Sequence, residues 1–129
     1  MNEKIQYWIE ISNYDLETAE AMHTAARYRY VGFMCHQTIE KIIKAVFVKI
    51  HNSTPPFIHS LNLLIDKSGI QDQLSESQLD FLDELGPLNL NTRYPAHKDS
   101  LYKLIDENKS IYYLENTKEF QKWLIKNYL

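Results

Sequence analysis

A stretch of about 21 residues, from Tyr30 to Ile50, has no proline and a single glycine near its start, and it most constrains how this chain folds. Its apolar residues recur at intervals of three and four, the spacing of one face of an α-helix. They are Cys35, Ile39, Ile42, Val46 and Ile50, and Phe33, Met34, Ile43 and Phe47 widen the stripe. Because a helix that is apolar over more than half of its circumference is usually buried by several neighbours, we predict a central helix here.

The polar residues of this predicted helix form one seam, where any chemistry should be sought. They are His36, Gln37, Glu40, Lys41 and Lys44. His36 and Glu40 stand four apart and could share a metal ion with His59 or His97. The two histidines of a helix-borne metalloprotease motif are absent, so we expect a hydrogen-bonded His36 and no metal. Glu40 and Lys44 are expected to form an ion pair on the helix surface, worth about 0.3–0.5 kcal/mol.

Residues 3–25 are predicted to form the first helix, because alanine and glutamate are plentiful and neither proline nor glycine interrupts. Its apolar line comprises Trp8, Ile11, Ala19, Met22 and Ala26. Asp15 lies on the same line, either at its edge facing water or partly buried. We favour a partly buried carboxylate paired with a cation or histidine of the second helix, since an unpaired buried charge is costly. Residues 27–29 are expected to form a short turn, so the two helices should pack antiparallel.

The later helices are expected to be shorter. Pro55 and Pro56 mark a connection over residues 51–58, followed by a helix over 60–67 that stops at Gly69. A capping box of Ser75 and Gln78 predicts a fourth helix that ends near Gly86 or Leu90. After a loop over 91–98, a short helix is expected over 99–107, and Ser110 is expected to cap the last one. The residues expected to face inward from the fourth and last helices are Leu79, Phe81, Leu82, Leu85, Ile111, Leu114, Phe120, Trp123 and Leu124.

No segment alternates long enough to predict a sheet, and the chain has no internal repeat. The predicted fold class is therefore all-α. We expect an antiparallel up-and-down bundle, with two long N-terminal helices and several shorter ones, in one domain over residues 1–129.

The composition excludes several classes of protein. The formal charge of -3 gives no global basic field, so any contact with RNA needs a local patch. A lone cysteine, Cys35, excludes an internal disulfide and a cysteine-rich metal site. No apolar run approaches the length of a membrane span and the N-terminus lacks a signal-peptide pattern, so we expect a soluble, cytoplasmic protein without membrane contact. There is no glycine-rich phosphate loop, and no cofactor is expected.

The segment from Arg93 to His97 is the most suggestive for function. Arg93 suits bidentate contact with a phosphate, Tyr94 can stack on a base, and His97 can move a proton near neutral pH. Together they could bind or cleave a phosphodiester. Alternatively, Pro95 locks this loop and Arg93 bonds to backbone carbonyls or to a carboxylate such as Asp83 or Glu84; both interpretations remain open.

His59, which follows the two prolines, also has two interpretations. It is expected to bond to free amides or to a carbonyl of the loop at the start of the third helix. A functional role is the second interpretation, because histidine titrates near neutral pH.

In their order and spacing, these motifs resemble the HEPN family of small helical domains, over roughly residues 5–128. The resemblance rests on Trp8, Tyr14-Asp15-Leu16, Ala19-Glu20, Cys35-His36-Gln37, Glu40-Lys41, Lys44-Ala45, Pro55-Pro56, His59, Leu61, Arg93-Tyr94-Pro95 and Trp123. It implies an antiparallel helical bundle that commonly forms a homodimer. It also implies a nucleotidyltransferase partner encoded beside it, in a toxin–antitoxin arrangement. With this resemblance, we assign nucleotide or RNA binding to Arg93, Tyr94, His36, Lys41, His59 and Asp15.

Many members of the family are metal-independent RNases that use an arginine and a following histidine across the dimer interface. Arg93 and His97 are the candidate catalytic pair, but the three residues between them are fewer than the family's RNase motif has. Arg29 and His36 have six residues between them, yet they lie at the start of the second helix and not at the usual site.

Three functional hypotheses follow from the sequence. The leading one is a dimeric module that binds a nucleotide, RNA or a nucleotidyltransferase-family partner. The second is a metal-independent endoribonuclease toxin that uses Arg93 and His97, and the third is a purely structural oligomerisation domain.

Overall fold

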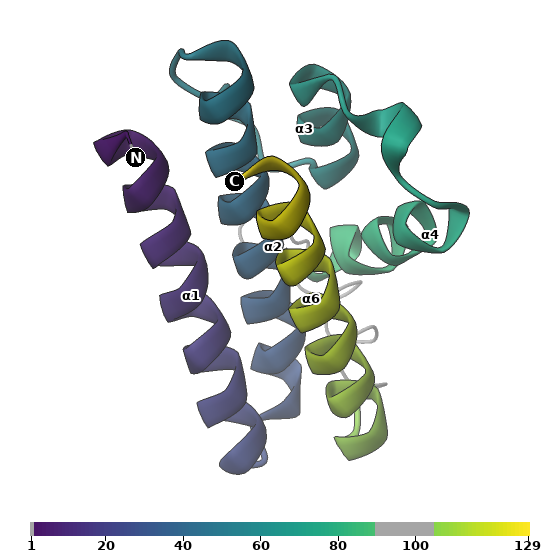
Figure 1. Cartoon of the computed structure of the whole chain (residues 1–129). Helices are drawn as coiled ribbons and strands as arrows, with labels where there is room; N and C mark the ends of the chain where they lie inside the picture. Colours follow the sequence, from purple (N-terminus) through teal and green to yellow (C-terminus); the bar gives the residue numbers. More distant parts are fainter. Residues whose placement is uncertain (1, 90–104) are drawn as a thin grey trace.

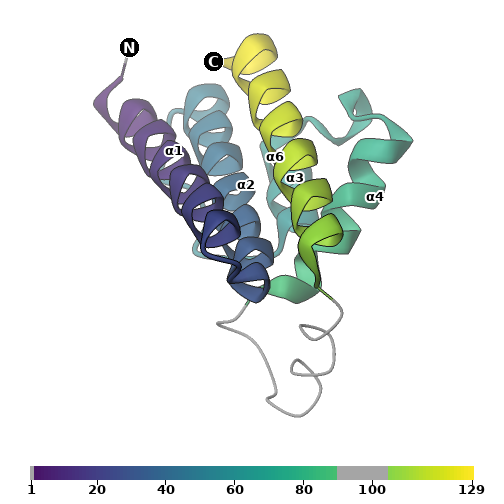
Figure 2. The ribbon, with the colours of Figure 1, turned by 90° about the horizontal axis from the view of Figure 1, so that it is seen from below.

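In the computed structural model, which describes residues 2–89 and 105–129, the long apolar stretch forms helix α2 (Tyr28–His51). Tyr28 and Arg29 are already helical, so the turn predicted at residues 27–29 is shorter than expected. Four helices pack against α2: α1 (Glu3–Thr24), α3 (Leu61–Ser68), α4 (Glu76–Leu85) and α6 (Glu107–Tyr128). Figures 1 and 2 show α1 and α6 on either side of α2, with α3 and α4 away from α1. The prediction of a central helix is therefore confirmed.

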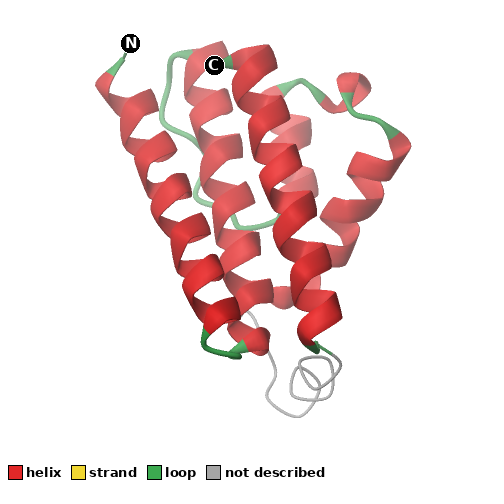
Figure 3. Ribbon diagram, turned by 60° about the horizontal axis from the view of Figure 1, so that its bottom comes forward, coloured by secondary structure: helices red, strands yellow, loops and turns green. Residues whose placement is uncertain are grey.

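Every regular element in the described ranges is a helix (Figure 3), which confirms the all-α fold class. Helices α1 and α2 run antiparallel, and α6 runs in the same direction as α2 (Figure 1). At 22 residues, α6 is as long as α1, so a third long helix closes the bundle. Within residues 2–89 and 105–129, no helix is long and apolar enough to cross a membrane.

The apolar stripe of α2 is buried except at its end. Cys35, Ile39, Ile42 and Val46 have no exposed surface, as predicted. Ile50 is 44% exposed, so its predicted burial is wrong. A helix advances about 100° per residue, which places Ile50 about 60° around the axis from Cys35 and toward solvent.

A buried chain of hydrogen bonds joins the three long helices. Ser12 of α1 donates its hydroxyl to the carbonyl of Thr38 in α2 at 2.7 Å. Gln121 of α6 donates through Nε2 to Ser12 Oγ at 2.9 Å and to Asn13 Oδ1 at 3.0 Å. Because these polar atoms satisfy one another, their burial is not penalised. On the predicted apolar line of α1, Ala19 is buried, whereas Ala26 lies beyond the helix in an exposed turn with φ 59°.

Local capping signals set the ends of the short helices. Ser60 accepts a hydrogen bond from the amide of Leu63 and begins α3, and Gly69 ends it with φ 81°, a conformation that favours glycine. Ser75 and Gln78 form the predicted capping box at the start of α4, with both reciprocal hydrogen bonds present. Two 3-10 turns that the sequence did not predict, η1 (Gln71–Gln73) and η2 (Gly86–Leu88), flank α4.

The start of α6 differs from the prediction. Asp106 caps the helix by accepting from the amide of Lys109, whereas Ser110 lies inside the helix and its hydroxyl is 2.8 Å from Nδ1 of His23. Ile111 is exposed because it lies about 100° around the helix from the buried Ser110. The predicted loop at 91–98 and most of the predicted helix at 99–107 lie outside the described residues, and residues 105 and 106 are not helical.

Gly32 of α2 faces side chains of η2 and of the chain before α6. A β-carbon at this position would come within 2.9 Å of Leu88 Cδ1 and 3.2 Å of Ile105 Cδ1. We therefore expect Gly32→Val to lower the free energy of unfolding by about 1–3 kcal/mol through overpacking. Urea denaturation measures the effect. Gly86→Val is the control, because no described atom lies within 4 Å of its β-carbon position; an equal loss in both variants would contradict the prediction.

Candidate binding site around Glu40

Glu40 lies in the middle of α2 and only 1% of its surface is exposed. Lys44, one turn further along, donates to Glu40 Oε2 at 3.1 Å. Both residues are buried, so the prediction of a surface ion pair is wrong. The burial arises because other elements cover this face of α2, which the spacing of the two residues does not reveal.

His59 reaches the same carboxylate from the connection between α2 and α3. This connection runs back along α2 (Figure 3) and places Nδ1 of His59 3.1 Å from both oxygens of Glu40. Because an ionised carboxylate can only accept hydrogen bonds, Nδ1 of His59 carries the proton. The expected bond from His59 to the loop backbone is therefore replaced by a bond to a side chain that lies 19 positions earlier in the chain.

Lys41 and Asp15 form the outer part of the cluster. The ammonium of Lys41 lies 3.8 Å from Glu40 Oε2 and 3.9 Å from Asp15 Oδ2, and it donates to Gln37 Oε1 at 2.7 Å. Both Lys41 and Asp15 keep a small part of their side chains exposed. The interpretation of Asp15 as a partly buried carboxylate facing a cation of the second helix is therefore confirmed.

The charges in the cluster shift one another's pKa. Burial alone would raise the pKa of Glu40, but Lys41, Lys44 and the hydrogen bond from His59 together hold it below its ordinary value. Burial raises the pKa of Asp15 and lowers the pKa of Lys41, and in both cases it outweighs the attraction between the two groups. Glu40 is thus the firmly ionised centre, and the charges of Asp15 and Lys41 are more easily neutralised.

His36 is buried against this centre. Its Nδ1 lies 3.8 Å from Glu40 Oε1 and 3.4 Å from Nε2 of Gln37. Within the described residues, no three histidine, cysteine, aspartate or glutamate side chains are arranged to hold a metal ion. Burial raises the pKa of the Cys35 thiol to about 12, so it is not a nucleophile at neutral pH.

The sequence does not reveal the roles of two residues in this region, Lys44 and Phe57. The sequence predicts Lys44 at the helix surface, whereas its ammonium lies 5.5 Å from the centre of the Trp8 ring, a cation–π geometry. The sequence places Phe57 in a connection, and in the structure it is 94% exposed with its ring centre 5.9 Å from that of His59. A phenylalanine directly after two prolines was the only signal in the sequence that an aromatic side chain is presented there.

The second predicted group, Arg93, Tyr94 and His97, lies outside the described residues. The carboxylates considered as partners of Arg93 have other contacts: Asp83 accepts from Asn62 at 2.7 Å, and Glu84 accepts from Tyr112 at 2.6 Å. Arg29 is exposed whereas His36 is buried, so this widely spaced pair does not form one site. The structure thus brings together Asp15, His36, Lys41 and His59, all around Glu40.

By its fold and site, this protein belongs to the class of all-α helical bundles, here with a buried ionic centre on the middle helix. The model of the HEPN domain matches residues 5–128, almost the whole chain. The chain therefore belongs to the HEPN family. No match was found among curated proteins.

Two solved structures share the fold over their whole lengths. TT1696 from Thermus thermophilus superposes with a TM-score of 0.80 and 15% sequence identity, covering 97% of this chain and 98% of that one. ST0689, an archaeal HEPN homologue, superposes with a TM-score of 0.69 and 18% identity, covering 100% of both chains. At these identities the likeness concerns the fold alone.

Proposed function

We propose that this protein is a HEPN module that binds the phosphate and base of a nucleotide or of single-stranded RNA beside Glu40. The observation that carries the proposal is the combination of the 94% exposed Phe57 with His59, whose imidazole is fixed on the buried carboxylate. An exposed aromatic ring is a platform on which a base can stack.

Phosphate contact is assigned to Lys41 and to the imidazolium form of His59, in which Nε2 also donates. Both lie at the same oxygen of Glu40, at 3.8 and 3.1 Å, and both retain some exposure while Glu40 does not. The donors of the cluster are thus nearer to solvent than its central anion. Since the ammonium of Lys41 lies 3.9 Å from Asp15 Oδ2, beyond the length of a hydrogen bond, an incoming phosphate can replace Asp15 as a partner of Lys41.

Lys41→Ala is expected to weaken binding of a fluorescent oligouridine about tenfold, because one phosphate contact is lost. For the same reason, the steepness with which log affinity falls with log salt concentration should decrease by about 1. Phe57→Ala is expected to weaken it by a similar factor through lost stacking, whereas Phe57→Tyr retains binding. Fluorescence anisotropy at several salt concentrations measures both effects.

Lys49→Ala is the matched control, because Lys49 is an exposed lysine of the same helix outside the cluster. Unchanged affinity in both Lys41→Ala and Phe57→Ala would contradict the proposed site. Metal-free cleavage of the RNA, abolished by Arg93→Ala or His97→Ala, would favour the endoribonuclease alternative instead.

We also propose that the protein acts as a homodimer with a nucleotidyltransferase partner in a toxin–antitoxin system. Membership of the HEPN family, whose domains generally dimerise, supports this proposal. Tyr7 and Tyr14 offer a contact surface, because they stand seven residues apart on one exposed face of α1. Light scattering tests the dimer, and co-purification of a nucleotidyltransferase from the native host tests the partner.

A further inference from the structure

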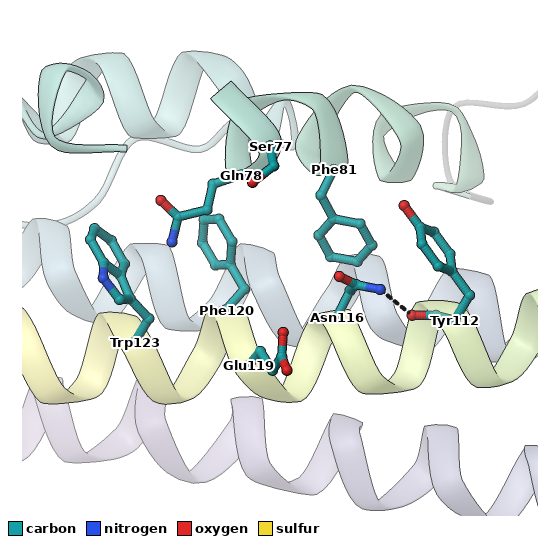
Figure 4. A pocket seen from close by; sticks show the side chains of 8 residues that line it. All are labelled: Ser77, Gln78, Phe81, Tyr112, Asn116, Glu119, Phe120 and Trp123. Atoms are coloured by element: carbon teal, nitrogen blue, oxygen red, sulfur yellow. Dashed lines mark hydrogen bonds between the residues drawn. The ribbon is translucent and has the colours of Figure 1, made fainter. Parts of the chain in front are cut away.

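A groove between α4 and α6 shares no residue with the cluster around Glu40. It encloses about 320 Å³, and its length follows α6 from Tyr112 to Trp123. Eleven residues of helix extend about 16 Å, the length of roughly five residues of extended peptide. Figure 4 shows aromatic rings from both helices along this groove.

The aromatic rings provide both the floor and the walls of the groove. Phe81 of α4 and Phe120 of α6 are buried and form the floor, whereas Tyr112 and Trp123 remain partly exposed at the two ends. Adjacent rings meet edge-on or tilted, with centroids 6.1 Å apart for Phe81 and Tyr112 and 6.4 Å apart for Phe120 and Trp123. The partly exposed rings of Tyr112 and Trp123 therefore offer aromatic surface to a ligand at the two ends of the groove.

The polar groups of the groove are mainly acceptors. Asn116 donates its amide to the carbonyl of Tyr112 at 2.8 Å, which leaves its Oδ1 to accept (Figure 4). Glu119 also lines the groove and has neither an ion pair nor a hydrogen bond within the described residues. Gln78 uses its Oε1 in the capping box of α4, so that only its Nε2 is left as a donor.

Two carboxylates, those of Glu84 and Asp80, lie near the Tyr112 end of the groove. Glu84 accepts the phenol hydrogen of Tyr112 at 2.6 Å, and this bond, with burial and the nearby charges of Glu84 and Asp80, raises the pKa of Tyr112 to about 12. Lys109 places its ammonium 5.0 Å from the centre of the Tyr112 ring, which shows that a cation can lie on this aromatic surface.

We propose that the α4–α6 groove is a binding site for the arginine side chains of a basic peptide segment in a partner protein. A guanidinium is flat, stacks on aromatic faces and carries a fork of donors that suits the free carboxylate of Glu119 and Oδ1 of Asn116. A lysine ammonium is more strongly hydrated and does not stack in this way. A nucleotide could stack its base here, but its phosphate would meet the negative field of Glu119, Glu84 and Asp80.

The proposal is tested by titrating the protein with the peptide Gly-Arg-Gly-Arg-Gly. Binding is monitored by NMR through the signals of the two tryptophan indole N–H groups. The signal of Trp123 is expected to shift and that of Trp8 to remain unchanged. The same peptide with citrulline in place of arginine keeps the shape and loses the charge, so it is expected to bind at least about tenfold more weakly. Adenosine monophosphate is expected not to shift Trp123.

Glu119→Gln is expected to weaken binding of the arginine peptide about tenfold, because it removes the only unpaired carboxylate lining the described groove. Glu115→Gln is the matched control, since both glutamates are exposed on α6 and Glu115 does not line the groove. Equal binding of the citrulline peptide, tighter binding of adenosine monophosphate at Trp123, or an equal loss in both variants would each overturn the proposal.

Discussion

Glu40→Ala is expected to lower the free energy of unfolding by about 3–5 kcal/mol, because it leaves the ammonium of Lys44 buried without its carboxylate. Lys44 is only 5% exposed and lies 3.1 Å from Glu40, so water cannot readily replace the lost partner. The hydrogen bond to His59 is lost at the same time. Urea denaturation followed by circular dichroism measures the change.

Glu20→Ala is the control for this prediction. Glu20 of α1 pairs with Lys118 of α6 at 3.6 Å, but both side chains are about half exposed. An exposed pair contributes at most about 1 kcal/mol, so this variant should remain close to the unmodified protein. A loss in Glu40→Ala no larger than that in Glu20→Ala would show that the ionic centre is not buried in solution.

A second variant distinguishes the unpaired charge from the loss of packing. If the charge of Lys44 causes the instability, adding Lys44→Met to Glu40→Ala should restore part of the stability, because the buried cation is then gone. If Glu40→Ala acts only by creating a cavity, the second substitution should add to the loss.

The contribution of Glu40 also has a defined pH dependence. Its folded-state pKa is held below the ordinary value of 4.5, so the folded protein binds a proton there less readily than the unfolded chain does. The stabilisation is therefore complete above about pH 4.5 and is lost as the pH falls through the folded-state pKa. Stability curves of the unmodified protein and of Glu40→Gln should accordingly converge at acid pH.

The sequence predicted the polar seam of α2 but not its environment. Helical periodicity shows which residues share a face, and it correctly grouped His36, Glu40 and Lys44. It does not show what covers that face, and here the cover comes from Trp8 of α1 and His59 of a distant connection. For this reason the seam was predicted while the burial of the Glu40–Lys44 pair was not.

Helix ends were predictable where the local signals were unambiguous. The capping box of Ser75 and Gln78 formed as expected, because both of its hydrogen bonds are local. At the start of α6, the sequence predicts Ser110 as the cap, whereas the structure has Asp106 there. Asp106 caps the helix instead of Ser110 because Ser110 is buried beside His23, a contact between residues 87 positions apart.

Ile42→Ala is expected to lower the free energy of unfolding by about 2–5 kcal/mol, because it removes buried methyl groups and leaves a cavity at the centre of the bundle. Ile42 has no exposed surface, and it belongs to α2, against which four other helices pack. The slope of the unfolding free energy against urea concentration should not change, since the folded state keeps its overall packing.

Ile50→Ala is a closely matched control, because it changes the same residue type on the same helix. Ile50 is 44% exposed in the last turn of α2, so its truncation should cost less than about 1 kcal/mol. The gain in helix propensity from isoleucine to alanine is common to both variants and cancels in their comparison. The difference between the two losses in the free energy of unfolding therefore reports the burial of α2 directly. Similar losses at the two positions would mean that α2 is not enclosed by its neighbours. The ionic centre around Glu40 would then be open to water.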